Sequence, residues 1–365
     1  DDDEGDDTSA FHPFFVLEVE REHILDQTLN KIKCTDPTEL KKHLKVVFKG
    51  EEGIDAGGVT KEFFQVLSED LFDVNSSLWS NRFGNVGNEI VNWFNSDCTW
   101  DAQGYELVGL LVGLALYNGV MLDVHFPLAV YRKILGLSLG VEDLFDEELK
   151  NGLHQLLTYD GDVENVFCLN FCVTWTVLGE EIEINLQPDG SKIPVTSDNR
   201  EEYVRLYVKW MLVDSVQKQW DAFEKGFWRV MGNSSLFLFR PDELELLVVG
   251  SPDLDFDALE QHTTYEGTYD KDTDCVVNFW LFVKSADRET QIKLLKFVTG
   301  TGSAPIGGLS ELSFVIQSAG GKSDHLPTSH TCFNTLLLPD YGKDYEKLSD
   351  RLGRAILECE GFGLQ

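Results

Sequence analysis

The sequence predicts an α+β protein built from two lobes. Its 365 residues, 42% of them hydrophobic, can bury a sizeable core and suit two domains or one large bilobed one. Apolar residues recur mostly at helical spacing before Gly250, whereas strand and helix patterns alternate in the last part of the chain. At Gly250–Asp253, turn residues interrupt the apolar pattern, and we expect a flexible joint there.

The charge balance is strongly acidic. Lys and Arg number 30 against 63 Asp and Glu, which gives a formal net charge of −33. Such a chain repels phosphate backbones and anionic lipid, so we expect no nucleic-acid partner but a protein with a basic surface. Seven irregularly spaced cysteines and no apolar signal peptide predict reduced thiols in a cytoplasmic or nuclear protein.

Residues 1–10, DDDEGDDTSA, form an acidic tail. We expect it to be disordered, because dense like charges repel one another and offer nothing to bury. An acidic interaction tail is the alternative interpretation. Because the chain lacks an initiator methionine, we expect a fragment of a longer protein or a processed form.

The segment LKVVFKGEEGIDAGGVTKEFFQVLSEDLF predicts a strand, a glycine-rich loop and a helix that begins near Val59. Glycine-rich loops can cradle phosphate. This loop lacks the Lys-Ser/Thr pair of a P-loop, and Glu51, Glu52 and Asp55 would repel phosphate. We therefore expect no phosphate site there.

The most apolar region runs from Leu107 to Val124. Asn118 interrupts it and Asp123 ends it, so it is too short for a membrane span and predicts a buried core helix. Gly109 and Gly113 have the spacing of a membrane dimer motif, but in this context they predict close packing against another helix.

A small subdomain is predicted from about residue 141 to 208. It combines a helix with an apparent hairpin, FCLNFCVTWTVLG followed by EEIEINLQPDG. Leu149, Leu153 and Leu156 form an i, i+4, i+7 stripe, which by itself is typical of core packing. A long helical stretch, REEYVRLYVKWMLVDSVQKQWDAFEKGFWRVM, then leads toward the joint.

The stretch HLPTSHTCFNTLLLP, residues 325–339, sets one cysteine apart from the others. Cys332 is expected to start a strand or to end the loop before it, because the apolar run after it has strand character. In extended chain His330 and Cys332 would share one face, where an imidazolium would favour the nucleophilic thiolate. From spacing alone, a buried core cysteine remains the alternative.

The other six cysteines have no comparable setting. We interpret them as packing residues without a zinc site: Cys34 and Cys359 on helix faces, Cys98 in a loop, Cys168 and Cys172 along a strand, and Cys275 near a helix start. No metal or cofactor is expected.

Long motifs extend along almost the whole chain after the acidic tail. They are LKVVFKGEEGIDAGGVTKEFF, GLLVGLALYNGVMLDVHFPLAVYRKILG, KIPVTSDNREEYVRLY, LFRPDELELLVVGS, FVTGTGSAPIGGLSELSF, LPTSHTCFNTLLLPDY and AILECEGFG. Together and in this order they closely resemble HECT-type ubiquitin-protein ligases. The resemblance is nearest to the subgroup named for its association with a papillomavirus oncoprotein.

The resemblance implies the bilobal HECT fold, an α+β architecture. A large, mostly helical N-lobe would span 11–249 and contain a small α/β subdomain, at about 141–208, that binds the ubiquitin-conjugating enzyme. A hinge at 250–253 would join it to a smaller α/β C-lobe at 254–365, which carries the catalytic cysteine. The smaller lobe of this family swings about that hinge.

The resemblance also implies a two-step transfer. A ubiquitin-conjugating enzyme passes ubiquitin to Cys332 as a thioester, and a lysine of a protein substrate then attacks that thioester. Exchange between thioesters is nearly balanced in free energy, so the protein mainly has to bring the groups together and exclude water. A full Cys-His-Asp relay is not required.

Site residues carry over from the matching motifs. The residues expected near the chemistry are Cys332, His330, Thr331, Phe362, Glu51, Glu62 and Asp123. The residues expected to form the conjugating-enzyme groove are Leu149, Leu153, Leu156, Tyr159, Phe167, Leu169 and Tyr203. The residues expected to form the hinge are Gly250, Ser251 and Pro252.

Some of these roles have alternatives. His330 is expected to position the loop, with general-base catalysis as the alternative. The three acidic residues would orient or deprotonate the substrate lysine, but they can equally be solvated or packing charges. Phe362 would position the lobes during lysine attack, unless the chain end is a frayed tail.

Three functions compete on the sequence: a ubiquitin ligase, a cysteine hydrolase and a catalytically silent docking module. A hydrolase needs a base, and no glycine-flanked protease signature surrounds Cys332. A silent module would be expected to have lost the cysteine or the terminal aromatic, yet both Cys332 and Phe362 are present. We therefore expect the ligase.

Overall fold

The structure is a computed structural model that describes residues 13–51, 58–73, 76–80, 85–86, 89–98, 102–177, 180–232 and 235–359. Within these ranges, only the backbone is described at Asn85, Val86, Glu89, Ile90, Val177, Lys322, Cys332, Glu358 and Cys359. The expected acidic tail, Glu52, Asp55 and Phe362 lie outside the described residues.

Two separate hydrophobic cores organise the chain. The larger core draws its buried side chains from Phe15 to Val248, and the smaller one from Leu254 to Ile356. The segment between them is the one in which the sequence predicted a joint. We use the names N-lobe for the residues before it and C-lobe for the residues after it. Mixed helix and sheet make this an α+β fold, as predicted.

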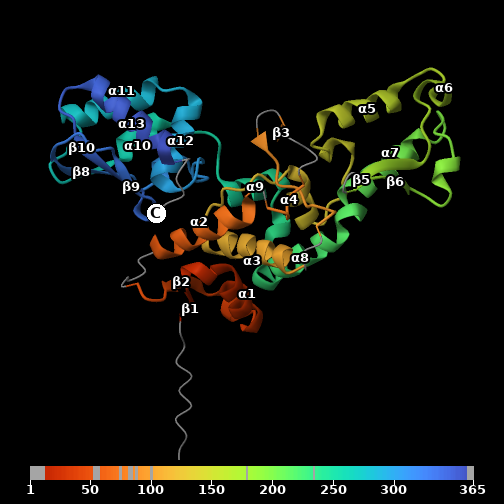
Figure 1. Cartoon of the computed structure of the whole chain (residues 1–365), viewed down its shortest axis with the longest axis horizontal. Coiled ribbons are helices and arrows are strands. Elements are labelled where there is room, and N and C mark those ends of the chain that lie inside the picture. Colours follow the sequence, from red (N-terminus) through yellow and green to blue (C-terminus); the bar gives the residue numbers. More distant parts are fainter. Residues whose placement is uncertain are drawn as a thin grey trace, which may run out of the picture.

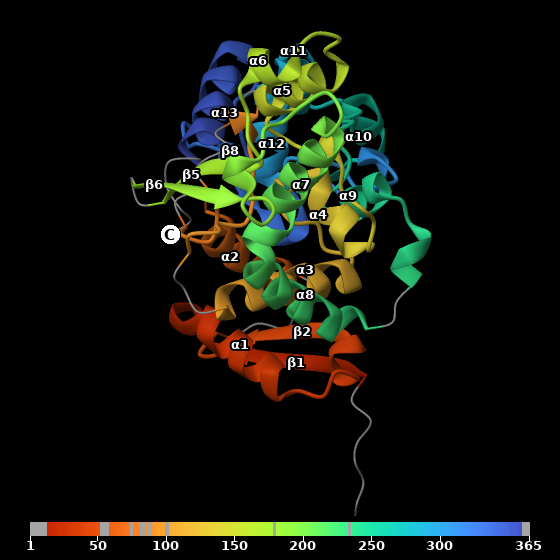
Figure 2. The ribbon, with the colours of Figure 1, turned by 90° about the vertical axis from the view of Figure 1, so that its right-hand side faces the viewer.

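A two-stranded parallel sheet forms one end of the N-lobe. Strand β1 (Phe14–Val19) pairs with β2 (His43–Phe48), and helix α1 (Ile24–Cys34) connects them. Alternate residues of β1 are buried, because one face of the sheet packs on the core while the other faces solvent. In both views this layer lies beneath the central helices (Figures 1 and 2).

Helices dominate the rest of the N-lobe. Its remaining elements outside the subdomain are α2 (Gly58–Phe72), β3 (Asn85–Val86), β4 (Glu89–Ile90), α3 (Gln103–Asn118), α4 (Leu128–Ile134), α8 (Gln217–Met231) and α9 (Pro241–Val249). Helix α3 is buried without a break from Tyr105 to Ala115, which confirms the predicted core helix. Across the described ranges, no helix combines the length and apolar character that crossing a membrane requires.

Helices α3 and α8 approach closely through glycines. A Cβ atom added at Gly109 would lie 2.0 Å from the carbonyl oxygen of Phe223, and one at Gly226 would lie 2.0 Å from that of Glu106. At Gly113 the nearest atoms would be 3.1 Å away. No side chain fits at the first two positions, so the predicted role of Gly109 and Gly113 in close helix packing is confirmed.

The small subdomain lies at one end of the molecule (Figure 1). Its elements are α5 (Glu147–Thr158), α6 (Val163–Phe167), β5 (Cys172–Val177), β6 (Glu180–Asn185) and α7 (Arg200–Leu212). The predicted hairpin is present as the antiparallel pair β5–β6. The predicted long helix is in fact two helices, because a 3₁₀ turn at Asp214–Val216 separates α7 from α8.

The C-lobe is a four-stranded sheet with helices against it. The elements are α10 (Phe256–His262), β7 (Thr264–Glu266), α11 (Asp274–Ser285), α12 (Arg288–Thr299), β8 (Val315–Lys322), β9 (Thr328–His330), β10 (Thr335–Asp340) and α13 (Tyr345–Cys359). The strand order is β7-β8-β10-β9, and only the β10–β9 pair is antiparallel.

Short 3₁₀ helices connect several of these elements. They are η1 (Arg21–His23), η2 (Glu39–Lys41), η4 (Val141–Asp143), η5 (Gly190–Lys192), η6 (Asp214–Val216), η7 (Ser235–Leu238), η8 (Leu309–Glu311) and η9 (Thr331–Phe333). Figure 1 shows the C-lobe and the small subdomain at opposite ends, with α2, α3 and α8 between them. Helix α2 faces the C-lobe, where it contacts the turn η9.

The contact between α3 and α8 predicts the effect of a small substitution. Gly109→Ala would force a methyl group against the Phe223 carbonyl, so the free energy of unfolding should fall by about 1–3 kcal/mol or more. Gly152→Ala is the matched control, because nothing lies within 4 Å of a Cβ atom at that helical position. This control should stabilise the chain by about 0.5–1 kcal/mol. Denaturant unfolding of both variants tests the prediction, and equal stability would contradict it.

Candidate functional site

Cys332 lies in a tight turn between two strands of the C-lobe sheet. Strands β9 and β10 pair in register, with Thr335 opposite His330, and η9 forms the connection. The backbone N–H of Asn334 donates to the Thr331 carbonyl at 3.2 Å. Since the chain turns here, the expectation that His330 and Cys332 share one face of an extended strand is wrong.

The turn is held rigidly at its C-terminal end. Asn334 has a left-handed backbone with φ 48°, a conformation that asparagine tolerates better than most residues, and its side chain is buried. Strand β10 follows directly and is central in the sheet, where Leu336 and Leu338 are fully buried. A buried central strand therefore fixes the position of the Cys332 backbone.

The residues next to Cys332 remain open to solvent on one side. His330 is exposed, Thr331 is half-buried, and 60% of the Phe333 side chain is accessible. The Cys332 side chain lies outside what the structure describes. The neighbours thus form a rigid backbone turn with an accessible outer side, which suits a thiol that other macromolecules must reach.

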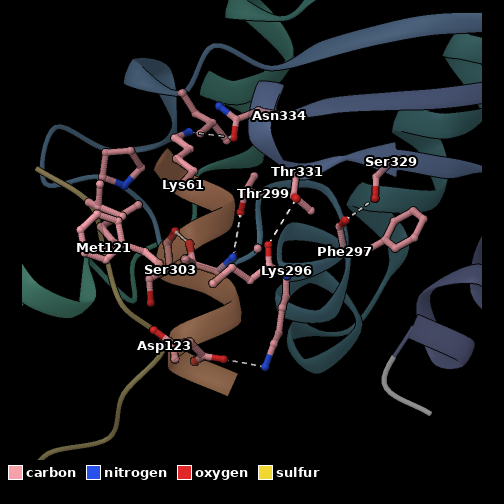
Figure 3. Close-up of a pocket in the computed structure, with 18 of the residues that line it drawn as sticks. Lys61, Met121, Asp123, Lys296, Phe297, Thr299, Ser303, Ser329, Thr331 and Asn334 are labelled. Atoms are coloured by element: carbon pink, nitrogen blue, oxygen red, sulfur yellow. Dashed lines mark hydrogen bonds and ion pairs between the residues drawn. The ribbon is translucent and has the colours of Figure 1, made fainter. Parts of the chain in front are cut away.

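Helix α2 of the N-lobe contacts the same turn from the other side. The Lys61 ammonium donates to Asn334 Oδ1 at 3.4 Å, and the Thr331 hydroxyl donates to Gln65 Oε1 at 3.3 Å. Lys61 and Gln65 are one helical turn apart, so they lie on one face of α2. The two hydrogen bonds therefore reach residues on either side of Cys332 in the chain, and Figure 3 draws the one from Lys61 to Asn334.

A third polar contact joins the lobes beside these two. The Lys296 ammonium on α12 lies 2.6 Å from Asp123 Oδ2, in the segment after α3. His125 Nε2 lies 3.8 Å from the other oxygen of Asp123. Figure 3 shows Asp123 and Lys296 pointing toward one another across the gap between the lobes.

A pocket of about 1260 Å³ opens between the lobes at this place. Its lining combines the polar contacts just described with apolar side chains from both lobes, including Phe64, Met121 and Phe297. Thr331 and Asn334 belong to the lining, so the pocket reaches the turn that carries Cys332. Ser329 fixes one wall, since its hydroxyl donates to the Phe297 carbonyl at 2.6 Å.

The three candidate acidic residues do not come together. Glu51 and Glu62 both bind Arg21, at 2.6 Å and 2.7 Å, and the guanidinium also lies 4.1 Å from the Phe48 ring centroid. The hydrogen bond from Arg21 lowers the pKa of Glu51 below its ordinary value, so this carboxylate stays charged. Of the three, only Asp123 belongs to the described pocket lining.

The residues expected to form the hinge contact the C-lobe. Ser251 and Ala304 exchange two backbone hydrogen bonds, of 2.7 Å and 2.8 Å. The Arg288 guanidinium donates to the Pro252 carbonyl. Gly250 has φ 83°, and a Cβ atom there would lie 2.6 Å from the Ala304 carbonyl oxygen, so only glycine fits.

Comparison with known proteins identifies the family. The model of the HECT-domain (ubiquitin-transferase) family matches residues 65–365. The chain belongs to this family. The description of this family names ubiquitin transfer as its activity.

Individual relatives agree with this assignment. The human probable E3 ubiquitin-protein ligase HERC3 is 39% identical over 358 residues, covering 97% of this chain and 34% of the relative. The mouse probable E3 ubiquitin-protein ligase HECTD2 is 39% identical over 96% of this chain and 47% of its own length. An E3 ubiquitin-protein ligase TOM1-like of Neurospora crassa is 37% identical over 94% of this chain and 9% of its own length. The chain thus spans less than half the length of these relatives.

The seven groove residues of this HECT domain differ in accessibility. Leu153, Leu156 and Tyr203 are buried in the N-lobe core, so their side chains are not accessible to a partner in this structure. The remaining four residues are half-buried or exposed: Leu149, Tyr159, Phe167 and Leu169. Tyr159, with 37% of its surface accessible, packs edge-on against Phe167 at 5.4 Å between ring centroids.

The thiols outside the turn that carries Cys332 have different settings. Cys34 and Cys168 are exposed, whereas Cys275 is fully buried and donates to the Pro339 carbonyl at 3.4 Å. Burial raises the pKa of the Cys275 thiol. Cys168 was expected along a strand, but it ends α6 with a left-handed backbone.

Sequence reasoning missed four residues of the site: Lys61, Gln65, Lys296 and Asn334. Lys61 lies inside a quoted motif, and Asn334 follows the cysteine by two positions, but nothing in the sequence pairs them. The four-residue spacing of Lys61 and Gln65 was the available signal, since it places both on one helix face. It does not say which surface that face contacts.

Thiol accessibility predicts a pattern of alkylation. Iodoacetamide at neutral pH should modify Cys34 and Cys168 quickly and Cys275 slowly, because burial blocks access and a raised pKa leaves little thiolate. Because the pKa of Cys275 is raised, its thiolate forms only at a pH above the ordinary thiol pKa, and its alkylation should increase only there. Peptide mass spectrometry of the folded chain measures each site, with the denatured chain as control. Fast alkylation of Cys275 in the folded chain would contradict the structure.

Proposed function

We propose that this chain is the catalytic part of a ubiquitin ligase in which Cys332 carries ubiquitin between a ubiquitin-conjugating enzyme and a substrate lysine. The proposal is supported by the family membership of the chain together with the geometry of the turn that carries Cys332. A cysteine stands at the end of a buried strand, its neighbours are accessible on one side, and a pocket between the lobes reaches the same turn.

The proposed chemistry consists of two acyl transfers. The Cys332 thiolate attacks the thioester of the conjugating enzyme, whose thiol leaves as a new thioester forms. The substrate amine then attacks that thioester, an amide bond forms, the amine loses a proton, and the Cys332 thiol is restored. Neither step needs a strong base, so the main contribution of the protein is to position the reactants and exclude water.

The separation between the small subdomain and the C-lobe requires the C-lobe to move between the two transfers. We propose that the conjugating enzyme docks on the small subdomain around Tyr159, Phe167 and Leu169. Figure 1 places that subdomain at the opposite end from the C-lobe. The C-lobe must therefore swing about Gly250–Pro252 to bring Cys332 to the docked enzyme and then return.

The finer assignments are also proposals. Motif similarity supports nearness to the subgroup named for a papillomavirus oncoprotein, although the relatives reported above bear other names. The net charge of −33 supports protein rather than nucleic-acid partners, and reduced cysteines support a cytoplasmic or nuclear location. His330 is proposed to position the turn and Phe362 the lobes during lysine attack. No role in lysine attack is proposed for Glu51 and Glu62, because Arg21 binds both.

Formation of a thioester adduct tests the proposed function. The chain is incubated with ubiquitin, activating enzyme, ATP and a panel of conjugating enzymes, and a reductant-sensitive adduct is sought. Cys332→Ala should abolish that adduct, whereas Cys34→Ser, which removes an exposed thiol, should leave it intact. A hydrolase or a silent docking module would form no adduct. Absence of the adduct with every conjugating enzyme, or its persistence in Cys332→Ala, would refute the ligase.

Substitution at the groove tests where the conjugating enzyme docks. Tyr159→Glu should lower the rate of adduct formation about tenfold or more, because a charge replaces an accessible aromatic of the kind that anchors interfaces. Val16→Glu is the control, since Val16 is an exposed apolar residue on β1, outside the subdomain. Single-turnover loading measures the effect. Equal loading by both variants would exclude the Tyr159 surface as the docking site.

A further inference from the structure

Three of the polar contacts that the described residues make between the lobes lie around the turn of Cys332, and we call these three contacts the seam. Two of them run from Lys61 and Gln65 on α2 to the residues on either side of the turn, and the third joins Asp123 to Lys296. Two contacts along one helix define an axis, and a third contact away from that axis prevents rotation about it. The seam therefore fixes the C-lobe in one orientation on the N-lobe.

This orientation leaves the chemistry accessible. The turn is contacted on its α2 side, while His330 and Phe333 on its outer side stay exposed. The pocket of about 1260 Å³ also remains open beside Thr331 and Asn334. A seam that served to block the thiol would be expected to cover these surfaces. Since the conjugating-enzyme subdomain lies at the other end, the orientation suits the second transfer rather than the first (Figure 1).

Asp123 therefore acquires a different role from the one its sequence motif implied. Lys296 lies 2.6 Å from one carboxylate oxygen, and His125 lies on the side of the other. A carboxylate bound to a lysine of the other lobe is poorly placed to deprotonate a substrate amine. Its charge is well placed to draw the lobes together, because opposite charges at this distance attract and the pair is partly shielded from water.

We propose that Asp123 and Lys296 form an interlobe latch that, with Lys61 and Gln65, holds the lobes in position while ubiquitin leaves Cys332 for a lysine. These are positioning residues, because they act through the orientation of the turn. The proposal rests on the proposed ligase function and concerns only its second step. Loading by the conjugating enzyme requires the seam to open, so the latch does not assist it.

Charge reversal and its rescue test the latch. The chain is first loaded with ubiquitin, ATP is then removed, and discharge of the thioester to free L-lysine is followed in a single turnover. Asp123→Lys and Lys296→Asp should each slow discharge about tenfold, the effect of about 1.4 kcal/mol on the barrier, because like charges then face each other. Loading should be unchanged or faster, because the seam has to open for that step.

The double variant separates a latch from a catalytic carboxylate. Asp123→Lys combined with Lys296→Asp restores the ion pair in reverse, and discharge should recover to within about threefold of the original rate. If Asp123 acts directly on the amine, the double variant stays as slow as Asp123→Lys, and the proposal fails. Faster discharge in the single variants would also overturn it, since the seam would then be inhibitory.

Two further arms complete the experiment. Gln65→Ala should slow discharge about threefold, the effect of losing a hydrogen bond worth about 0.7 kcal/mol, without changing loading. Asp70→Lys reverses an exposed charge on the same helix outside the described pocket lining, and it should change neither step. If the unaltered chain forms no thioester, the proposed function itself is refuted. Normal loading and discharge in all four seam variants would refute only the latch.

Discussion

The contact between α3 and α8 is the constraint on which the rest of the N-lobe depends. At Gly109 and Gly226 the two backbones approach so closely that no Cβ atom fits at either position. The buried face of α3 is thereby shared between α8 and the layer that includes α2. Because α2 packs on α3, apolar contacts of the N-lobe core hold the face that presents Lys61 and Gln65 to the C-lobe.

Apolar periodicity and turn residues were enough to predict several single elements of the fold. The beginning of α2, the buried helix α3 and the hairpin β5–β6 follow from apolar periodicity and turn residues. The break between α7 and α8 was missed because helical spacing continues across Asp214–Val216. The turn at Thr331–Phe333 was missed because it depends on strand pairing and on the left-handed Asn334.

The candidate site was predictable only in part, for a physical reason. The resemblance of the long motifs singled out Cys332, since local spacing alone left a buried core cysteine as the alternative. The seam joins residues far apart in the chain, such as Lys61 and Asn334, which are separated by 273 positions. Single polar contacts between residues so far apart leave no periodic pattern in the sequence from which they could be predicted. Burial was also not predictable at Leu153 and Leu156, because an apolar stripe is compatible with either an exposed groove or a buried core.

The bonds between Ser251 and Ala304 limit how the C-lobe can travel. If these bonds and the one from Arg288 to Pro252 persist, residues from Ser251 onward move as part of the C-lobe. The N–H of Gly250 is bonded to Leu246 at the end of α9, which leaves the torsions of one glycine as the pivot. Rotation about the two backbone torsions of a single residue confines Cys332 to a surface around Gly250. The distance from Gly250 to Cys332, rather than the flexibility of a linker, then sets which bound enzymes the thiol can reach.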